Sequence, residues 1–214
     1  MAKAPVAGRV KTRLCPPCTP EAAARIAAVA LADTLDAAGA APAVRRTLVV
    51  DGDYVAPEGW AILRQRGSGL AERLAHAFAD TALPGVPTLL IGMDTPQVTA
   101  HHLAAAAILL TAGTRGAATD PQPTVDAVLG PATDGGWWAL GLRDPARAAV
   151  LREVPMSTSD TGARTIAALR GRGLRVGFLP ELRDVDTVED ALAVAALCPP
   201  GSRFAAAVPR MVPA

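Results

Sequence analysis

A cluster of cations around a glycine, near the start of the chain, is the first segment whose residue types suggest chemistry. Its members are Lys3, Gly8, Arg9, Lys11 and Arg13. Backbone N–H groups beside a glycine, together with lysine and arginine side chains, can hold a pyrophosphate. The Gly-x-x-x-x-Gly-Lys-Ser/Thr spacing of a Walker loop is absent. The segment therefore predicts phosphate binding of another kind, with a solvated basic segment as the alternative.

A second signal is an aspartate that follows an apolar run typical of a buried strand. Asp94 comes shortly after residues 88–91, which are Thr-Leu-Leu-Ile, and Pro96 then starts the next turn. A carboxylate in that place would point into the crevice at the end of the strand. A divalent ion such as Mg²⁺ or Mn²⁺ binds such oxygens while it bridges phosphates. An Asx turn or a helix cap is the alternative.

A pair of aspartates further along the chain has two compatible interpretations. Asp184 and Asp186 are two residues apart, so on an extended segment both carboxylates would point to one side. They could ligate a metal ion. Alternatively, Asp186 or Thr187 could cap the helix that follows, since acidic residues fill its first turn. The residues alone leave both roles open.

One segment combines a tight turn with two bulky aromatic side chains. It contains Asp134, Gly135, Gly136, Trp137 and Trp138. Asp134 could bind sugar hydroxyls or act as a general base, and one of the tryptophans could stack on a sugar or a base. The alternative is a hairpin turn with a core tryptophan, and we expect at least one of the two to be structural.

A weaker signal lies between a predicted strand at residues 61–63 and the helix after it. Gly67 and Gly69 have no side chains and leave the backbone accessible there. Gln65 could contact the edge of a nucleobase, and Arg73, one helical turn further on, could reach a phosphate. A lone Gly-x-Gly is weak evidence, so a plain connecting loop is the alternative.

Alternating strands and helices must position these motifs. Short apolar runs predict strands over residues 47–50, 61–63, 88–91, 127–129, 137–142 and 176–179. Capped Ala-rich runs predict helices over residues 20–38, with Thr19 as the N-cap, and over 68–81, 99–110, 160–170 and 187–197. This order predicts a three-layer α/β fold, with a mostly parallel sheet and helices on both faces. Ligands bind beyond the carboxyl ends of the strands in such folds, where the motifs above fall.

Composition and charge exclude several classes of protein. The chain has 214 residues, of which 50% are hydrophobic, and a net charge of +1. That charge argues against a nucleic-acid-binding protein, and apolar stretches such as His102 to Leu110 are too short to span a membrane. We expect one domain over residues 1–198 and a proline-rich, loosely attached tail over residues 199–214.

The cysteines and the absence of a signal peptide predict a cytoplasmic protein. Cys15 and Cys18 form a Cys-x-x-Cys motif, which can be a redox or a metal pair. A structural zinc site would need two more ligands at a suitable spacing. Two loop cysteines before a helix are therefore the favoured interpretation. The sequence gives no indication of an oligomeric state.

Taken in order, five segments resemble one family, the bacterial radical-SAM/selenodomain-associated transferases, often labelled as arsenosugar-biosynthesis glycosyltransferases. The segments are AKAPVAGRVKTRL, QRGSGLAERL, LLIGMDTPQVT, VLGPATDGGWWALGL and RDVDTVEDA. More distantly, the chain is similar to the molybdenum cofactor cytidylyl- and guanylyltransferases and to the phospholactate guanylyltransferase. The resemblance implies the Rossmann-like GT-A fold of nucleotide-diphospho-sugar transferases.

The resemblance also implies a metal-dependent transferase that takes a nucleotide-activated sugar and a small-molecule acceptor. It assigns phosphate binding to Lys3, Gly8, Lys11 and Arg13, base contacts to Gln65 and Gly67, metal ligation to Asp94 and Asp186, and the acceptor side to Asp134, Gly135, Gly136, Trp137 and Trp138. Lys11, Arg13 and Asp134 would be catalytic, the first two by stabilising the leaving group. The alternatives are a nucleotidyltransferase that moves a nucleoside monophosphate from a triphosphate to a phosphorylated acceptor, and an inactive nucleotide-binding relative.

Two departures from the resembling family bear on the fold and on the acceptor. Its members carry a hydrophobic strand immediately before the Lys3 segment, and this sequence begins at Met1, so we expect the first strand of the sheet to be missing. Met156 stands where a tryptophan is expected before Ser157, which puts acceptor contacts there in question.

Overall fold

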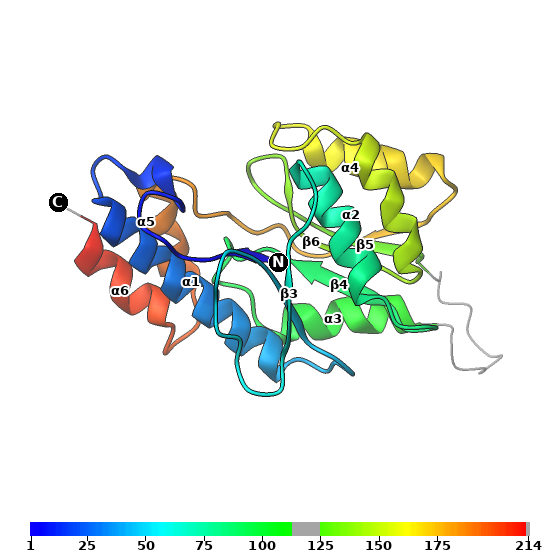
Figure 1. Ribbon diagram of the computed structural model, residues 1–214, viewed down its shortest axis with the longest axis horizontal. Helices are drawn as coiled ribbons and strands as arrows, with labels where there is room; N and C mark the ends of the chain where they lie inside the picture. Colours follow the sequence, from blue (N-terminus) through cyan, green and yellow to red (C-terminus); the bar gives the residue numbers. More distant parts are fainter. Residues whose placement is uncertain (113–124, 213–214) are drawn as a thin grey trace. The chain divides into compact units, whose positions relative to one another are not determined.

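The computed structural model describes residues 1–112 and 125–212. The chain divides into two compact units, each assembled from segments that are distant in sequence (Figure 1). Unit 1 comprises Met1–Arg64, Gly92–His101 and Leu182–Ala214, and unit 2 comprises Gln65–Ile91 and His102–Glu181. The single domain expected over residues 1–198 stays a prediction.

Unit 1 contains three parallel strands in the order β1-β2-β3. They are β1 (Ala2–Lys3), β2 (Thr47–Asp51) and β3 (Ala61–Arg64). The central residues of β2 are buried because this strand lies between the other two, whereas every residue of β3 is exposed. A first strand is therefore present, and the prediction that it is missing was wrong. It is short, and it pairs only with Val50 and Asp51 of β2.

Side-chain caps define where the helices of unit 1 begin. α1 spans Pro20–Ala40, and the Thr19 hydroxyl accepts a hydrogen bond from the backbone N–H of Ala22 at 3.2 Å. α5 spans Val188–Leu197 and starts with a capping box between Thr187 and Asp190. Both caps satisfy N–H groups that lack partners within their helix. They confirm Thr19 and Thr187 as the capping residues.

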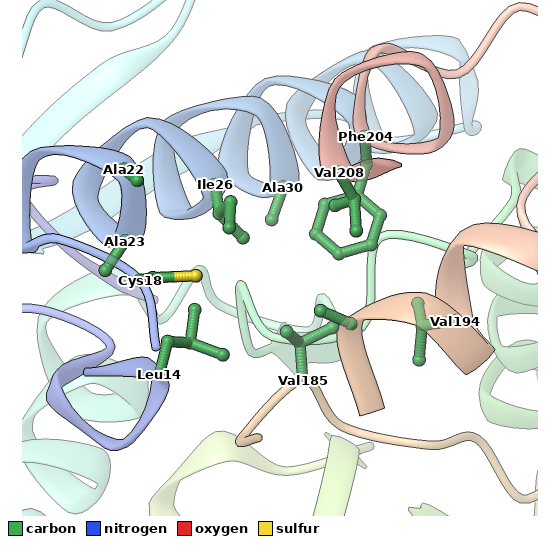
Figure 2. Close-up of a cluster of buried hydrophobic side chains, with 11 residues drawn as sticks. Leu14, Cys18, Ala22, Ala23, Ile26, Ala30, Val185, Val194, Phe204 and Val208 are labelled. Carbon is green, nitrogen blue, oxygen red and sulfur yellow. The ribbon is translucent and has the colours of Figure 1, made fainter. Parts of the chain in front are cut away.

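The C-terminal segment of unit 1 is a packed helix, and the prediction of a loosely attached tail was wrong. α6 spans Arg203–Met211 and lies beside α1 (Figure 1). Phe204 and Val208, one helical turn apart, are fully buried. Figure 2 shows them pointing into a cluster that includes Ile26 of α1 and Val194 of α5. The prolines misled the prediction because Pro209 comes only after this apolar pair, in the last turn of the helix.

Unit 2 contains a four-stranded sheet in the order β4-β6-β5-β7. Its strands are β4 (Thr88–Ile91), β5 (Ala127–Pro131), β6 (Trp137–Leu142) and β7 (Val176–Phe178). β5 and β7 are parallel, whereas β6 runs antiparallel to both β4 and β5. The reversal follows from the tight turn between β5 and β6, since only antiparallel neighbours can be joined by so short a connection.

Helices cover both sides of the unit 2 strands. The elements are α2 (Leu70–Thr81), α3 (Ala100–Thr111, of which the part from His102 belongs to this unit), α4 (Thr161–Gly171) and the 3-10 helix η2 (Pro145–Glu153). Figure 1 shows α3 on one side of the strands and α2 and α4 on the other. The layered α/β arrangement predicted from the alternating pattern is thus confirmed.

The structure also bears on the cysteine motif and on membrane insertion. In the described part of the chain all three cysteines are free thiols, and Cys18 packs in the cluster of Figure 2 just before α1. This placement agrees with two loop cysteines ahead of a helix. Across residues 1–112 and 125–212, no helix combines the length and the hydropathy needed to cross a bilayer.

Candidate functional site

Two backbone segments of unit 1 that are distant in sequence are joined beside Asp94. The backbone N–H of Val185 donates to the carbonyl oxygen of Asp94 at 2.9 Å. The side-chain amide of Gln97 donates to the carbonyl oxygen of Arg183 at 2.7 Å. Val185 and Gln97 are both buried, so these bonds are shielded from water. They bring the two predicted metal ligands, Asp94 and Asp186, into one place.

Lys11 lies between the two carboxylates. Its Nζ atom is 2.6 Å from Oδ1 of Asp94 and 3.6 Å from Oδ1 of Asp186, and it also donates to the carbonyl oxygen of Val185. An ammonium group has three N–H donors, and the oxygens of Asp94 and Val185 lie within hydrogen-bond distance of it, whereas Asp186 is at ion-pair distance. The Lys11 side chain is only 6% exposed, against 47% for Asp94 and 36% for Asp186. A buried ammonium is thus balanced by two half-exposed carboxylates.

Arg13 completes this group of charges. Its guanidinium donates to Oδ2 of Asp186 at 2.9 Å and is 74% exposed. We call Lys11, Arg13, Asp94 and Asp186 the charge cluster. It contains two positive and two negative groups and is therefore neutral overall. An exposed ion pair such as Arg13–Asp186 contributes less than about 1 kcal/mol to stability.

The other two predicted phosphate-binding residues lie on the same N-terminal segment. Lys3 is exposed on β1, and its backbone N–H donates to the sulfur of Met93 at 3.2 Å. Gly8 has a φ of +72°, and open space surrounds the position where a side chain would begin. The backbone at Gly8 is thus accessible, and a phosphate role for both residues stays a prediction.

In unit 2, the turn predicted to face the acceptor is anchored to the start of α4. Asp134 is exposed, and its Oδ1 atom accepts a hydrogen bond from the N–H of Gly136 at 2.7 Å. The carbonyl oxygen of Gly135 accepts from the N–H of Gly162 at 2.8 Å. The hairpin turn expected as the alternative for this motif is present, since β5 and β6 pair antiparallel on either side of it. The same bonds hold the Asp134 carboxylate at the tip of a fixed turn.

The two tryptophans after this turn differ in burial. Trp138 is 2% exposed, its indole N–H donates to the carbonyl oxygen of Pro180 at 3.0 Å, and its ring meets that of His102 edge-on. This burial contradicts an acceptor contact by the Trp138 side chain and makes it the structural tryptophan of the pair. Trp137 is half-buried, and its N–H donates to the hydroxyl of Thr165 at 3.2 Å. Of the two, Trp137 is thus the one that remains partly exposed.

The loop before α2 is tied to that helix. The Nε of Arg73 donates to the carbonyl oxygen of Gly67 at 3.2 Å. The backbone N–H and the hydroxyl of Ser68 both donate to Glu72 at 2.8 Å, and these bonds, the backbone one foremost, lower the pKa of the Glu72 carboxyl. Arg73 therefore has a structural contact in the loop. Nucleotide contacts by Gln65, Gly67 and Arg73 stay predictions.

The charge cluster is suited to a metal ion that is also bound by the phosphate groups of a substrate. Among residues 1–112 and 125–212, no three His, Cys, Asp or Glu side chains are grouped so as to hold a metal ion. Asp94 and Asp186 are hard oxygen donors, and Mg²⁺ is commonly bound by one or two carboxylates with substrate phosphates and water. The residues fit an ion of that kind and do not form an all-protein cage.

Comparison with solved structures identifies the fold. The chain is 25% identical to a solved structure from Desulfovibrio desulfuricans G20, called a "putative nucleotide-diphospho-sugar transferase", with a TM-score of 0.80 over 97% of this chain and 91% of that one. Rv0371c from Mycobacterium tuberculosis H37Rv is 20% identical, with a TM-score of 0.54 over 88% and 92%. Its complex with manganese is 21% identical, with a TM-score of 0.53 over 90% and 94%. The protein thus has the α/β fold of nucleotide-diphospho-sugar transferases.

Sequence comparison gives a family without an assigned activity. No curated protein sequence matches the chain. Residues 22–158, well over half of the chain, match the family described as uncharacterized protein conserved in bacteria (DUF2064). The protein belongs to this family.

Proposed function

We propose that this protein is a metal-dependent transferase that takes a nucleotide-activated sugar as its donor. The observation that carries the proposal is the charge cluster, in which two carboxylates and two cations meet in unit 1. The likeness to the Desulfovibrio protein supports the class of donor. The manganese complex of Rv0371c supports a divalent ion, with Mn²⁺ or Mg²⁺ as candidates. An association with radical-SAM or arsenosugar chemistry stays a prediction of the resemblance.

In this proposal the charge cluster binds the diphosphate of the donor. Asp94 and Asp186 hold the ion, whose charge offsets that of the diphosphate. Lys11 and Arg13 donate hydrogen bonds to the phosphate oxygens and stabilise the negative charge that develops on the departing nucleotide. Lys3 and the backbone at Gly8 extend the same phosphate contacts along the N-terminal segment.

The acceptor and the base are assigned to residues of unit 2. Asp134 accepts the proton of an acceptor hydroxyl, acting as the general base. Gly135 and Gly136 shape the turn that carries Asp134, and the exposed part of Trp137 stacks on a sugar ring. Gln65 and the backbone at Gly67 contact the nucleobase. Each of these roles follows from the resemblance and is supported by the fixed geometry of the two loops.

A nucleotidyltransferase is the second candidate. Its supporting observation is the basic N-terminal segment, because Lys3, Lys11 and Arg13 on one segment suit a triphosphate. An acceptor phosphate would attack the α-phosphorus of a nucleoside triphosphate, forming a new phosphoanhydride bond and breaking the bond to the β-phosphate, so that pyrophosphate leaves.

The released product separates the two candidates. The purified protein is incubated with Mn²⁺ and either a panel of nucleotide sugars or a panel of nucleoside triphosphates, with simple sugars and phosphorylated sugars as acceptors. Release of a free nucleoside diphosphate from a nucleotide sugar is the expected result. Release of pyrophosphate from a triphosphate would support the second candidate instead, and neither product from any donor would count against both.

Gln97 is expected to fix the spacing of the two carboxylates. Gln97→Met keeps the shape of the side chain but removes the hydrogen bond to Arg183. It also removes the Gln97 Oε1 atom, a buried acceptor that has no partner among the described residues. Since a lost bond and a removed unsatisfied group offset each other, we expect a change in unfolding free energy below about 1 kcal/mol. Mn²⁺ affinity measured with a bound nucleotide is expected to fall about tenfold.

Thr34→Val is the matched control for this experiment. Thr34 is also a buried polar residue of unit 1, and its hydroxyl donates to the carbonyl oxygen of Ala30 within α1 at 2.8 Å. This variant loses a comparable bond away from Asp94 and Asp186, so its Mn²⁺ affinity should match that of the wild type. A Gln97→Met protein that binds Mn²⁺ normally would show that the bond to Arg183 serves folding alone.

A further inference from the structure

We propose that Lys11 is an exchangeable internal cation, which competes with the divalent ion for Asp94 and Asp186 and so makes metal binding depend on the nucleotide. The inference rests on the proposed function, and it adds that the ion and the nucleotide bind in one step. The ion enters together with the phosphates, and Lys11 moves from the carboxylates to those phosphates in the same step.

The Lys11 ammonium uses carboxylate oxygens that a divalent ion would need. Its Nζ atom contacts Oδ1 of both aspartates, and Oδ2 of Asp186 is bound by Arg13. A divalent ion that binds either oxygen of Asp186, or Oδ1 of Asp94, must therefore share or replace these contacts. The half-exposed aspartates remain open to solvent, so an ion can reach them without a change in the backbone.

The charge balance of the cluster disfavours a divalent ion that arrives without phosphates. Lys11 and Arg13 already offset the two carboxylates, so a divalent ion arriving alone would give the cluster a net charge of +2 beside a buried ammonium. Like charges at such distances disfavour each other strongly. A diphosphate that arrives with the ion supplies the missing negative charge and a new set of acceptors for Lys11. The nucleotide is thus expected to raise the affinity for the ion.

The Lys11 side chain can move while its backbone stays in place. Val10 and Leu14, on either side of it, are buried in the apolar clusters of unit 1. The N–H of Leu14 donates to the carbonyl oxygen of Lys11 at 3.0 Å. The flexible side chain of lysine, in contrast, has several rotatable bonds and a compact charge that adapts to new partners. Exchange between carboxylate and phosphate therefore needs only a change of rotamer.

Mn²⁺ titrations with and without a nucleoside diphosphate test this proposal. Free Mn²⁺ is followed by electron paramagnetic resonance in the wild type, in Lys11→Gln and in Arg25→Gln. UDP, GDP, ADP and CDP are the probes. In the wild type, the best of these probes is expected to raise Mn²⁺ affinity at least about tenfold. In Lys11→Gln, Mn²⁺ alone should bind about tenfold tighter, and the enhancement by the nucleotide should shrink.

The controls separate this inference from the proposed function. Arg25 is exposed on α1, so Arg25→Gln removes one positive charge from unit 1 outside the charge cluster and should leave every affinity unchanged. Absence of Mn²⁺ binding to the wild type under all conditions would overturn the proposed function. Wild-type Mn²⁺ binding that is equally tight with and without nucleotide would overturn both the exchange and the metal-dependent binding of the donor, because coupling between two ligands is reciprocal. A folded Lys11→Gln protein that binds Mn²⁺ no more tightly than the wild type would overturn the exchange alone.

Discussion

Asparagine in place of Asp94 is expected to abolish metal-dependent nucleotide binding, with a loss of Mn²⁺ affinity of at least about a hundredfold. Removal of an outer partner of a metal ligand commonly costs ten- to a hundredfold, and Asp94 is assigned as a ligand itself. The change also takes the 2.6 Å ion pair from the nearly buried Lys11 ammonium. Asp186 at 3.6 Å is then the only carboxylate within salt-bridge distance of Lys11 among the described residues.

Asp53→Asn is the control for this variant. Asp53 is an exposed aspartate of unit 1 that pairs with Arg64. Its replacement by asparagine removes one negative charge, as Asp94→Asn does, but at a solvent-exposed position. Titration with Mn²⁺ and a nucleoside diphosphate should separate the two variants clearly, and ligand-free melting temperatures show whether either one is misfolded. If Asp94→Asn folds and still binds nucleotide in a Mn²⁺-dependent way, the assignment of Asp94 as a ligand is wrong.

Alanine in place of Gly135 is expected to destabilise unit 2 by about 4 kcal/mol or more. Gly135 has a φ of +88°, a conformation that strains an ordinary residue. A Cβ atom there would also lie 1.9 Å from the carbonyl oxygen of Ser159, which is backbone and cannot swing aside as a side chain can. Overpacking of this kind typically costs 1–3 kcal/mol and occasionally more. To relieve the clash, the turn would have to move away from α4, and Asp134 would move with it.

Gly85→Ala separates backbone strain from the steric clash. Gly85 also belongs to unit 2 and has a φ of +71°, but nothing lies within 4 Å of the added Cβ. Its replacement should cost about 1 kcal/mol. Urea unfolding of the two variants measures the difference directly. Equal stabilities would mean that the turn carrying Gly135 moves freely, and the fixed placement of Asp134 would then lose its basis.

Residues with strong local signals made much of the fold predictable. The strand at residues 137–142 was predicted with its observed bounds, because bulky apolar residues follow a tight glycine turn and continue to Leu142. Thr19 and Thr187 mark helix starts by side-chain chemistry that acts within a few residues. α6 was missed because of the prolines after residue 198, although two local signals mark it: Ser202 is its N-cap, and the apolar residues Phe204 and Val208 are one helical turn apart.

The candidate site was predictable in its residue types but not in its contacts. Asp94 and Asp186 were identified from their places after a strand and before a helix, and the structure brings them together in unit 1. The position of Lys11 between them depends on the backbone bond from Val185 to Asp94, a long-range pairing that the sequence does not display. Gln97 was missed for the same reason, although it lies within the quoted Asp94 motif, only three residues after the aspartate.

Binding of a nucleotide diphosphate together with a divalent ion is the central claim of this account. A thermal-shift panel of nucleoside diphosphates, triphosphates and nucleotide sugars, each with and without Mn²⁺, tests it most directly. A ligand at a hundredfold excess over its Kd stabilises the folded protein by about 2.7 kcal/mol, which such a panel detects. We expect at least one nucleotide sugar to raise the melting temperature, and we expect the rise to depend on Mn²⁺. No shift with any nucleotide, or an equal shift without Mn²⁺, would contradict this claim.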